Sequence, residues 1–574
     1  MGLASNMGKM KALLFCLGII FSFSIAAGTH AERGSSGHLK ILFWQAPSIM
    51  NPYLSGGLKE IEASSLVVEP LARFDQDGNL IPWLAKTIPT VENGGISADL
   101  TSITWTLREE LLWSDGAPVT AEDILFTHEY CTHPDSGCAR GDEFESIATI
   151  KAVDKQTVVI TFSGSKTFPY IAFVGSTLPI LQKKQFEDCL GVNAHGCSKQ
   201  NFMPIGTGPF VVTEFRPNDV ILLKANENYR HPNKPGFARV TFKGGGDAMA
   251  AGRAVLETGE FDYAWNLQLP PSILSQLEAQ GKGRIISSFG TSVERIEVNL
   301  TNPDPALGEE RSTLAYPHPF LSDFTVRKAL SLAIDRNILN EIGYGITGQP
   351  TCNILAAPSY YASTNNDSCL VQDIAEANKI LDNAGWQRGP DGIRTKDGIR
   401  LSFLFQTSTN SVRQNFQALI KQWWVAIGVE TELRNIDASV FFGGDPGNPD
   451  TYLKFYADLQ MYTSSFEGTD PESSLATWKC GQEPSPQSQW LGVNIPRYCD
   501  PAYDALVEEL ESTGQLNRRI ELAKAMNDKL IQEYILIPLI HRGNVSAHAN
   551  TLEGVKLNTW DAELWNVADW TRSQ

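Results

Sequence analysis

Alternating apolar and polar positions predict β-strands in the first third of the chain. Residues 103–107 read Ile-Thr-Trp-Thr-Leu and residues 157–162 read Thr-Val-Val-Ile-Thr-Phe, so alternate side chains are apolar in both segments. A strand turns successive side chains to opposite faces, and this period therefore places the apolar ones on one face. We predict two strands, each with one buried face.

Apolar residues recur every three or four positions in two later segments, which is typical of helices. The residues are Phe416, Leu419, Ile420, Trp423, Trp424 and Ile427 in the first segment, and Tyr503, Leu506, Val507 and Leu510 in the second. Gly428 ends the first stripe, as glycine often does at a helix C-terminus. Thr120 and Asp123 have capping-box spacing, with Asp in place of the usual Glu, and predict a third helix. Together these patterns indicate a mixed α/β fold.

The N-terminal residues have the pattern of a secretory signal. Two lysines precede an apolar run over residues 12–25, and small residues follow up to Ala31. The run is too short for a comfortable transmembrane helix, so we expect cleavage near Ala31 and export from the cytoplasm. Cys16 lies inside the run rather than after a small residue at its end, which argues against a lipoprotein. We expect residues 1–31 to be a signal peptide, with an uncleaved anchor as the alternative.

Eight cysteines follow residue 31, and they occur as sequence neighbours. The neighbouring pairs are Cys131 and Cys138, Cys189 and Cys197, Cys352 and Cys369, and Cys480 and Cys499. Short loops close most easily, and an exported protein meets an oxidising compartment, so four sequential disulfides are favoured. A zinc site is the alternative for the first pair, because His128 and His133 lie beside it. The turn at residues 134–137 favours the disulfide.

Length, composition and charge restrict the function classes. The chain has 574 residues, 42% of them apolar and 20% charged, with a formal net charge of −18. At roughly 150 residues per domain, this length predicts about three or four domains. Nucleic-acid binding needs dense positive charge against the phosphates, so no nucleic-acid partner is expected. Aromatic residues make up 10% of the chain, which suits large cores or stacking surfaces for ligands.

Familiar catalytic motifs are missing from the sequence. The zinc-protease pattern His-Glu-x-x-His, the nucleophile pattern Gly-x-Ser-x-Gly and a complete dinucleotide-binding fingerprint do not occur. The nine histidines are scattered along the chain, so neither a metal site nor a cofactor is expected. Carboxylates are plentiful, so a hydrolase that uses a pair of them stays open as an alternative.

An ordered set of short motifs carries a family resemblance. The motifs are Glu69-Pro70-Leu71, residues 77–85 and 105–108, Trp113-Ser114-Asp115-Gly116, residues 120–123, 204–209 and 226–229, Gly259-Glu260-Phe261-Asp262, residues 326–330 and 333–336, Asp500-Pro501-Ala502-Tyr503-Asp504 and Ile537-Pro538-Leu539. In this order they resemble the extracytoplasmic solute-binding proteins of peptide ABC importers, the oligopeptide/dipeptide/nickel-binding family. Most of these motifs are turns, caps and core contacts, so they identify the fold more than the site.

The resemblance implies an α/β fold, a two-lobed periplasmic-binding-protein clamp with an extra inserted domain. Lobe I would be discontinuous and comprise residues 38–68, 205–295 and 535–574. Residues 69–204 would form the extra domain II, and residues 296–534 would form lobe III. Binding between the lobes would close a hinge over the ligand. The closed monomer would then dock on an ABC permease in the inner membrane.

The resemblance also implies where a peptide binds. In peptide-binding members an acidic residue just before an Asp-Pro-like step pairs with the ligand's amino terminus, and Glu467 falls where those members carry aspartate. A glutamate can neutralise an ammonium with a charge-assisted hydrogen bond. Ser464 replaces the family's tryptophan in this stretch, which leaves Tyr462 and Phe466 as the nearby aromatics. The alternative for Glu467 is a solvated loop position.

Three further residues are candidates for ligand contact. Trp265 and Asn266 lie near the family's crossing between lobes, where an aromatic ring and an amide would wall the cleft. Ordinary packing is the alternative for both. Arg413 lies at the start of the helix predicted over residues 416–427, and a helix start with a guanidinium suits a ligand carboxylate. A solvated surface arginine is the alternative there.

The function that the resemblance implies is capture of a peptide for an importer, without covalent chemistry. The nearest alternative keeps the clamp and changes the ligand to an oligosaccharide or an opine-like amino-acid conjugate. Nickel is less favoured because no histidine cluster falls in the expected cleft. An exported hydrolase is the alternative from another class, and sensory or chaperone-like reuse of the clamp also stays open.

Overall fold

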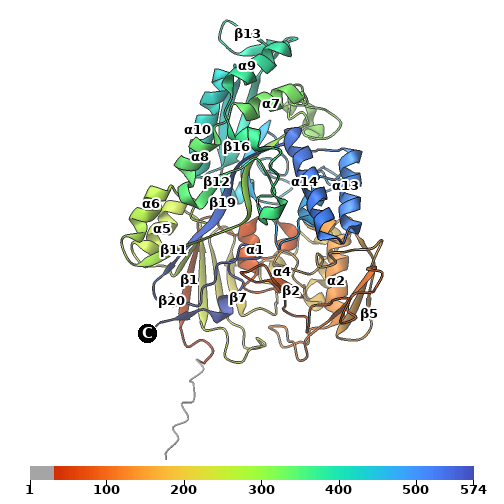
Figure 1. The fold of residues 1–574 in the computed structure, drawn as a ribbon. Coiled ribbons are helices and arrows are strands. Elements are labelled where there is room, and N and C mark those ends of the chain that lie inside the picture. Colours follow the sequence, from red (N-terminus) through yellow and green to blue (C-terminus); the bar gives the residue numbers. More distant parts are fainter. Residues whose placement is uncertain (1–31, 574) are drawn as a thin grey trace, which may run out of the picture.

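The protein is described here by a computed structural model that covers residues 32–573 (Figure 1). The predicted signal peptide and its cleavage site therefore lie outside the described residues. Within residues 32–573, no helix is long and apolar enough to cross a membrane.

An 11-stranded sheet extends through the whole molecule (Figure 1). The lower part of the molecule contains the strands at residues 38–43 and 210–216, and the upper part contains the strand at residues 402–408. In order across the sheet, the strands are β17 (Glu430–Ile436), β16 (Ser402–Ser408), β18 (Leu459–Ser464), β11 (Gly283–Val298), β19 (Leu536–Ala549), β10 (Tyr263–Trp265), β1 (His38–Phe43), β9 (Arg239–Gly244), β8 (Val220–Ala225) and β7 (Phe210–Arg216), with β12 (Gly348–Pro350) beside β19. Strands from distant parts of the sequence are therefore neighbours in this sheet.

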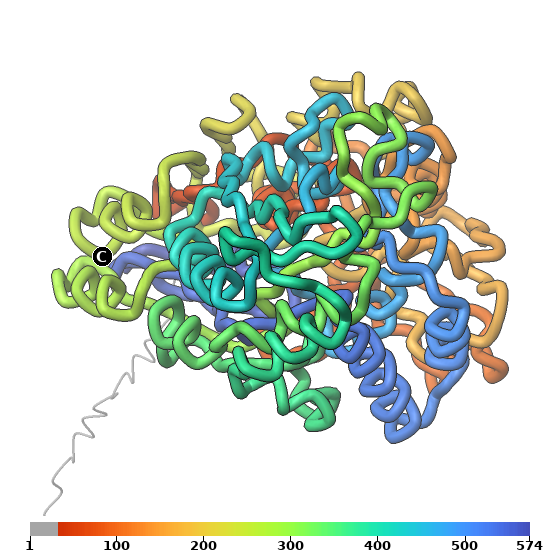
Figure 2. Tube along the Cα trace, turned by 90° about the horizontal axis from the view of Figure 1, so that it is seen from above, coloured from red at the N-terminus to blue at the C-terminus, as the bar shows by residue number. Residues whose placement is uncertain are grey.

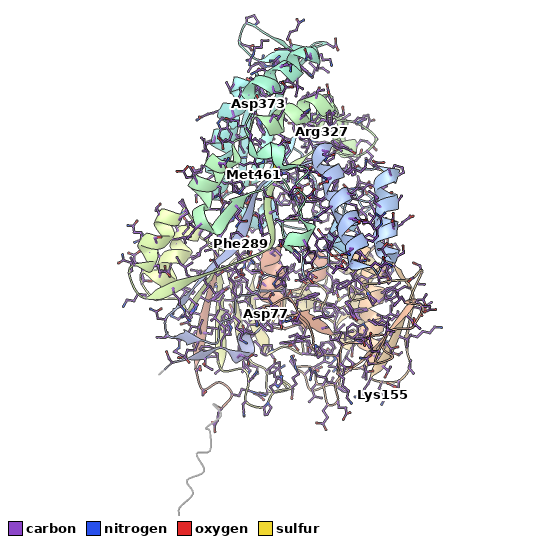
Figure 3. The ribbon with its side chains drawn as sticks, in the orientation of Figure 1. Asp77, Lys155, Phe289, Arg327, Asp373 and Met461 are labelled. Carbon is purple, nitrogen blue, oxygen red and sulfur yellow. A yellow bond between two sulfur atoms is a disulfide. The ribbon has the colours of Figure 1, made fainter. Side chains whose placement is uncertain are left out.

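Two long strands connect the two parts. β11 has 16 residues and β19 has 14, so at ~3.3 Å per residue each spans roughly 50 Å. β19 pairs with β10 near its C-terminal end and with β12 at residues 540–542, and the second half of β11 pairs with β18. The β11–β19 ladder is irregular between Phe289 and Val293, and Figure 3 places Phe289 where the two parts meet. A bulge of this kind bends the strand that carries it.

Helices and small sheets complete the two parts. The helices are α1 (Leu58–Ser64), α2 (Ala121–Thr132), α3 (Lys183–Phe186), α4 (Ser198–Phe202), α5 (Ala248–Leu256), α6 (Pro271–Glu278), α7 (Phe324–Leu332), α8 (Arg336–Gly343), α9 (Ile374–Asn383), α10 (Ser411–Ala426), α11 (Ala438–Phe441), α12 (Glu472–Ala476), α13 (Pro501–Ser512) and α14 (Leu516–Gln532). The small sheets are β4 (Ser102–Thr106) with β6 (Thr157–Phe162) and β5 (Ile147–Ala152), β2 (Ala72–Phe74) with β3 (Leu80–Pro82), β13 (Gln387–Arg388) with β14 (Arg394–Lys396) and β15 (Ile399–Arg400), and β20 (Leu552–Glu553) with β21 (Thr571–Arg572).

Several separate hydrophobic cores hold these layers together. One core lies between residues 53 and 194 and includes the large buried side chains Trp105, Trp113 and Tyr130. A second packs the helices of the upper part against β16 and β18, with Trp424 at its centre. A third lies under the strands of the lower part and includes Trp570. In Figure 2, seen from above, segments of every colour surround the middle of the molecule.

The elements predicted from periodicity are present. The two predicted strands are β4 and β6, which pair antiparallel with one buried face each. The predicted helices are α10 and α13, and their apolar stripes are buried or partly buried. The capping box at Thr120 and Asp123 opens α2 as expected. The predicted α/β fold class is thus confirmed, because local periodicity reports which face of an element is buried.

The predicted domain boundaries stay predictions. β11 continues through the proposed boundary between residues 295 and 296, and β19 begins at Leu536, next to the boundary at 535. The long strands thus belong to both parts of the molecule.

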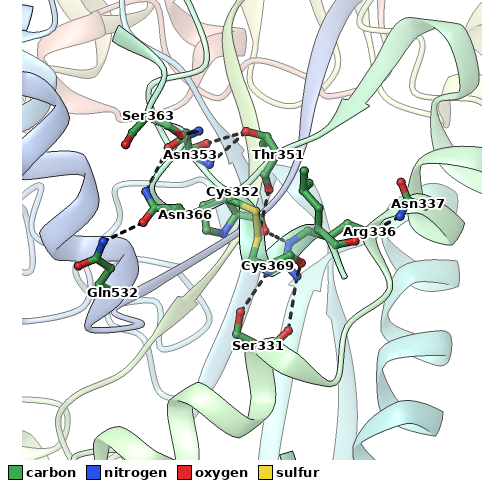
Figure 4. The surroundings of a disulfide bond; sticks show 12 residues. Ser331, Arg336, Asn337, Thr351, Cys352, Asn353, Ser363, Asn366, Cys369 and Gln532 are labelled. Carbon is green, nitrogen blue, oxygen red and sulfur yellow. Dashed lines mark hydrogen bonds between the residues drawn. A yellow bond between two sulfur atoms is a disulfide. The ribbon is translucent and has the colours of Figure 1, made fainter. Parts of the chain in front are cut away.

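The four sequential cysteine pairs are disulfides, with Cα–Cα distances of 5.1, 5.9, 5.9 and 4.6 Å in chain order. Because Cys131 and Cys138 bond to each other, neither thiol is free for the alternative zinc site. Figure 4 shows the pair Cys352–Cys369, where the Arg336 guanidinium donates to the Cys369 carbonyl at 2.8 Å. This disulfide anchors the start of α8, since Arg336 is the helix's first residue.

Candidate ligand-binding site

A cavity of about 300 Å³ lies between the parts of the molecule. Its wall comes from α1, from residues 139–143 and 168–178, from the end of β18 and the loop after it, from α12, and from residues 559–563. All six residues predicted to contact ligand line it, namely Glu467, Tyr462, Phe466, Trp265, Asn266 and Arg413. Their roles toward a ligand stay predictions, and their surroundings differ.

Glu467 lies in the loop after β18 and reaches across to residues 176 and 177. Its carboxylate accepts hydrogen bonds from the Ser176 hydroxyl at 2.6 Å and from the Thr177 hydroxyl at 3.0 Å. One carboxylate oxygen occupies the place that a side chain on Gly175 would take, so glycine is needed there. Gly175 also has a φ of +78°, which favours glycine. Glu467 is therefore a partly buried acid held by hydroxyls, and the solvated alternative is wrong.

The charge of Glu467 is not balanced by a basic partner within residues 32–573. Burial, with a further contribution from the nearby carboxylate of Asp561, raises the pKa of Glu467 to about 7. The neighbouring Arg73 is already committed, because it donates two hydrogen bonds to Asp561 at 3.0 and 3.3 Å. A cationic ligand group next to Glu467 would supply the missing positive charge.

The two predicted aromatic residues have different environments. The Tyr462 ring lies in an aromatic cluster with Phe441, Phe442 and Tyr452, at centroid distances of 6.3, 6.1 and 5.4 Å. Phe466 is partly buried, and its backbone N–H and carbonyl both bond to the Thr291 hydroxyl. These aromatic side chains give the cavity an apolar wall beside the loop that carries Glu467. Such a wall can pack against apolar groups of a ligand.

Trp265 and Asn266 both line the cavity, but Trp265 mainly packs in the core, whereas Asn266 makes polar contacts. The Trp265 ring is 4% exposed and stacks on Phe43 with centroids 4.5 Å apart, so most of its surface is in the core. Asn266 has a φ of +54°, a left-handed conformation that asparagine tolerates. Its carbonyl accepts from the Trp44 indole at 2.8 Å, and its side-chain oxygen accepts from the Arg542 guanidinium at 2.7 Å.

Arg413 is buried, so the alternative of a solvated surface arginine is wrong. Only 2% of it is exposed, and its guanidinium donates two hydrogen bonds to Glu294 at 2.7 and 3.3 Å. Further bonds go to the hydroxyls of Ser408 and Thr463. Asn410 caps α10 just before it. Arg413 thus ties this helix to β11, and its charge is already neutralised.

Sequence reasoning missed most of the charged residues in the cavity wall. They are Lys59, Glu62, Arg140, Asp142, Glu143, Arg295, Asp470, Glu472, Arg542, Asp561 and Glu563. Together with Glu467 and Arg413 they make eight acidic and five basic side chains in the wall. Burial raises the pKa of Asp142 to about 6 and, with repulsion from Asp142, that of Glu143 to about 8. The one sequence signal for this pair is its place just after the disulfide at Cys138.

The chain matches the family model of bacterial extracellular solute-binding proteins, family 5 (Middle), over residues 79–485. It is 24% identical to the nickel-binding periplasmic protein of Escherichia coli (strain K12), with 93% of each chain covered. It is 22% identical to the oligopeptide-binding protein AppA of Bacillus subtilis (strain 168), with 97% of this chain and 95% of that protein covered. A shorter match, 29% identical, covers 64% of this chain and 61% of Protein XP55 of Streptomyces lividans.

Solved structures share the fold. AppA of B. subtilis in complex with a nonapeptide has a TM-score of 0.79 at 20% identity, with 95% of this chain and all of that chain covered. NikZ of Campylobacter jejuni in complex with Ni(L-His) has a TM-score of 0.77 at 23% identity, with 94% of this chain and all of that chain covered. These similarities confirm the predicted two-lobed clamp as the fold.

Proposed function

The chain belongs to the family 5 bacterial extracellular solute-binding proteins, and we propose that it captures a peptide in the cavity and delivers it to an ABC permease. In this proposal the protein is exported through a cleaved signal peptide, acts in the periplasm as a monomer, and performs no covalent chemistry. Relatives named as oligopeptide-, di/tripeptide- and nickel-binding proteins support transport as the general role.

One observation favours a peptide over an uncharged ligand. Glu467 is a carboxylate in the cavity wall that has hydroxyl partners but no basic partner within residues 32–573. A peptide's amino terminus is a cation at neutral pH, and its amine would form a charge-assisted bond with this acid. A neutral sugar has no cationic group and would not form this bond with Glu467. For nickel, no group of three or more potential ligand side chains occurs among the described residues.

The test is binding of defined peptides to the purified protein, measured by calorimetry and native mass spectrometry. A pool of synthetic di- to pentapeptides should give saturable binding without any hydrolysis product. The same pool with acetylated amino termini is the matched control, and it should bind at least about tenfold more weakly. Equal binding of the two pools would remove the amine from the recognition. Binding of oligosaccharides alone would replace the peptide as the proposed ligand, and accumulating product would favour the hydrolase.

A further inference from the structure

Two of the buried arginines in the cavity wall leave guanidinium nitrogens without protein partners. In structural arginines elsewhere, such as Arg336 and Arg497, all three guanidinium nitrogens donate hydrogen bonds within the protein. The same is true of Arg413. Arg295 uses a single nitrogen, which donates to Glu297 at 2.7 Å, and Arg542 uses two. Arg295 and Arg542 both line the cavity, so their remaining donors are available to a ligand.

Arg542 differs from Arg295 because it has no counter-ion. It is 5% exposed, and no carboxylate oxygen of residues 32–573 lies within 4.0 Å of its guanidinium nitrogens. Its two bonds go to neutral acceptors, the side-chain oxygen of Asn266 at 2.7 Å and the carbonyl of Gly543 at 3.3 Å. An unpaired charge in a buried site is costly, so proteins keep one chiefly where a partner arrives.

The acids nearest to Arg542 are engaged elsewhere. Glu294 accepts from Arg413, from the Tyr344 hydroxyl at 3.0 Å and from the Thr463 hydroxyl at 2.6 Å. Glu563 accepts from two hydroxyls, those of Tyr263 and Ser546. Neither acid forms an ion pair with Arg542.

Asn266 holds Arg542 in place. Its backbone N–H donates to the Ser546 hydroxyl at 3.2 Å, and the Trp44 indole donates to its carbonyl. With both backbone groups fixed, the side-chain oxygen is directed at the Arg542 guanidinium. An amide can orient a guanidinium without neutralising it, whereas an aspartate of the same shape would neutralise it. The choice of Asn at position 266 therefore keeps the charge of Arg542 available.

We propose that Arg542, oriented by Asn266, binds a carboxylate of the ligand. The inference rests on the proposed function, because it concerns the same cavity, and it narrows the ligand to a zwitterion: an amine at the Glu467 loop and a free carboxylate at β19. A guanidinium pairs with a carboxylate through parallel N–H···O bonds, and the Nη1 nitrogen of Arg542 donates to no protein acceptor, so it can make such a bond. Peptides with a free carboxyl terminus and acidic amino-acid conjugates both have this chemistry.

The binding test compares one peptide pool in two forms, with free and with amidated carboxyl termini. Wild-type protein should prefer the free acids by about tenfold or more. In Arg542→Gln and in Asn266→Asp this preference should fall to about one. Asn266→Asp is the sharper variant, because it keeps the side-chain shape and gives Arg542 an internal carboxylate. A preference unchanged in both variants overturns the proposal.

A second measurement needs no ligand and separates this inference from the proposed function. If Arg542 is reserved for ligand, Arg542→Met should leave the thermal midpoint of the ligand-free protein unchanged or raise it. Arg413→Gln is the matched control on the same cavity wall, and it should lower the midpoint, because Glu294 loses its partner. A similar drop in both variants would make Arg542 structural and overturn the inference. If neither peptide pool binds wild-type protein, the proposed function fails, and this comparison still decides the role of Arg542.

Discussion

At the scale of single residues, burial raises the pKa of Glu467, the residue proposed to bind the amine of the ligand. Its carboxylate is held by the hydroxyls of Ser176 and Thr177, which fix its position without supplying charge. Arg73 and Asp561 form an ion pair beside it, so the positive charge of Arg73 is already balanced by Asp561. The loop acid therefore stays both ordered and unbalanced, which is the state in which an incoming ammonium gains most.

Replacing this acid should weaken binding selectively. Glu467→Gln keeps the shape and removes the charge, so affinity for an amine-bearing peptide should fall by at least about tenfold, about 1.4 kcal/mol. Calorimetry with free and acetylated forms of one peptide measures the effect. The acetylated form is the control and should bind wild type and variant about equally. Undiminished affinity for the free amine would exclude Glu467 from the site.

Binding of the amine should also depend on pH. The pKa of Glu467 is raised to about 7 in the ligand-free protein, by burial and by Asp561, with Glu143 and Arg73 as further charged neighbours. A bound ammonium favours the ionised carboxylate, so binding below pH 7 must release a proton. Affinity should therefore rise from about pH 5 to about pH 7, by at most about tenfold per pH unit, and then level off. In Glu467→Gln this component of the profile should be absent.

The same pKa fixes the sign of the stability change. In the unfolded chain Glu467 ionises near its ordinary value of 4.5, whereas the folded protein keeps the proton up to about pH 7. Between these values the folded state binds more protons, so the free energy of unfolding falls as pH rises. The contribution is complete below about pH 4.5 and is lost by about pH 7. Denaturation of wild type and Glu467→Gln across this range isolates it, and parallel curves would contradict it.

At the scale of elements, local disulfides fix the segments that shape the cavity. Cys131 lies in the last turn of α2, and its partner Cys138 comes just before Arg140, Asp142 and Glu143 in the cavity wall. A second disulfide, between Cys480 and Cys499, closes a loop that includes residues 491–495 of the same wall. Each bond therefore restricts a segment that lacks long helices or strands of its own.

Removing these disulfides should lower stability by an amount that depends on loop length. In the chain-entropy model, the separations of 7 and 19 residues correspond to about 2.5 and about 3 kcal/mol of unfolding free energy. Urea denaturation of the double variants Cys131→Ser/Cys138→Ser and Cys480→Ser/Cys499→Ser measures both. Peptide mapping without reductant is the control for pairing in the wild type. Free thiols in that map would contradict the disulfide assignment.

At the scale of the whole molecule, two long strands join the parts that enclose the cavity. The β11–β19 ladder is irregular between Phe289 and Val293, while the cavity wall draws on both parts. Contacts such as Gln482 to Glu145, at 2.7 Å, bridge segments 337 residues apart. Ligand that touches both sides would hold such contacts together, which is how a clamp closes.

Ligand should therefore stabilise and compact the molecule. At a concentration of about 100 times the dissociation constant, a ligand that binds only the folded state adds about 2.7 kcal/mol to the free energy of unfolding. Thermal denaturation with the peptide pool should show this shift, and small-angle scattering should show a smaller radius of gyration. The acetylated pool is the control for both. A stabilised protein of unchanged radius would mean that binding does not require closure.

Local patterns in the sequence predicted several helices and strands, the four disulfides and the family. Periodicity in β4, β6, α10 and α13 follows from burial of one face, and a face is a property of neighbouring residues. Sequential disulfides join short loops, so their pairing is also local. The family resemblance proposed Glu467 and four further residues as ligand contacts, and the predicted helix start proposed Arg413. All six line the cavity.

The contacts of each of these residues are set by the folded chain and could not be predicted from the sequence. Arg413 could be a surface residue or a ligand contact from its helix position alone, and it is buried because Glu294, 119 residues away, neutralises it. The partner of Arg73 lies 488 residues away, at Asp561. Arg542 belongs to no sequence motif. It is singled out because no carboxylate among residues 32–573 forms an ion pair with it. Burial and pairing of charges depend on segments that meet only after folding, so no local pattern encodes them.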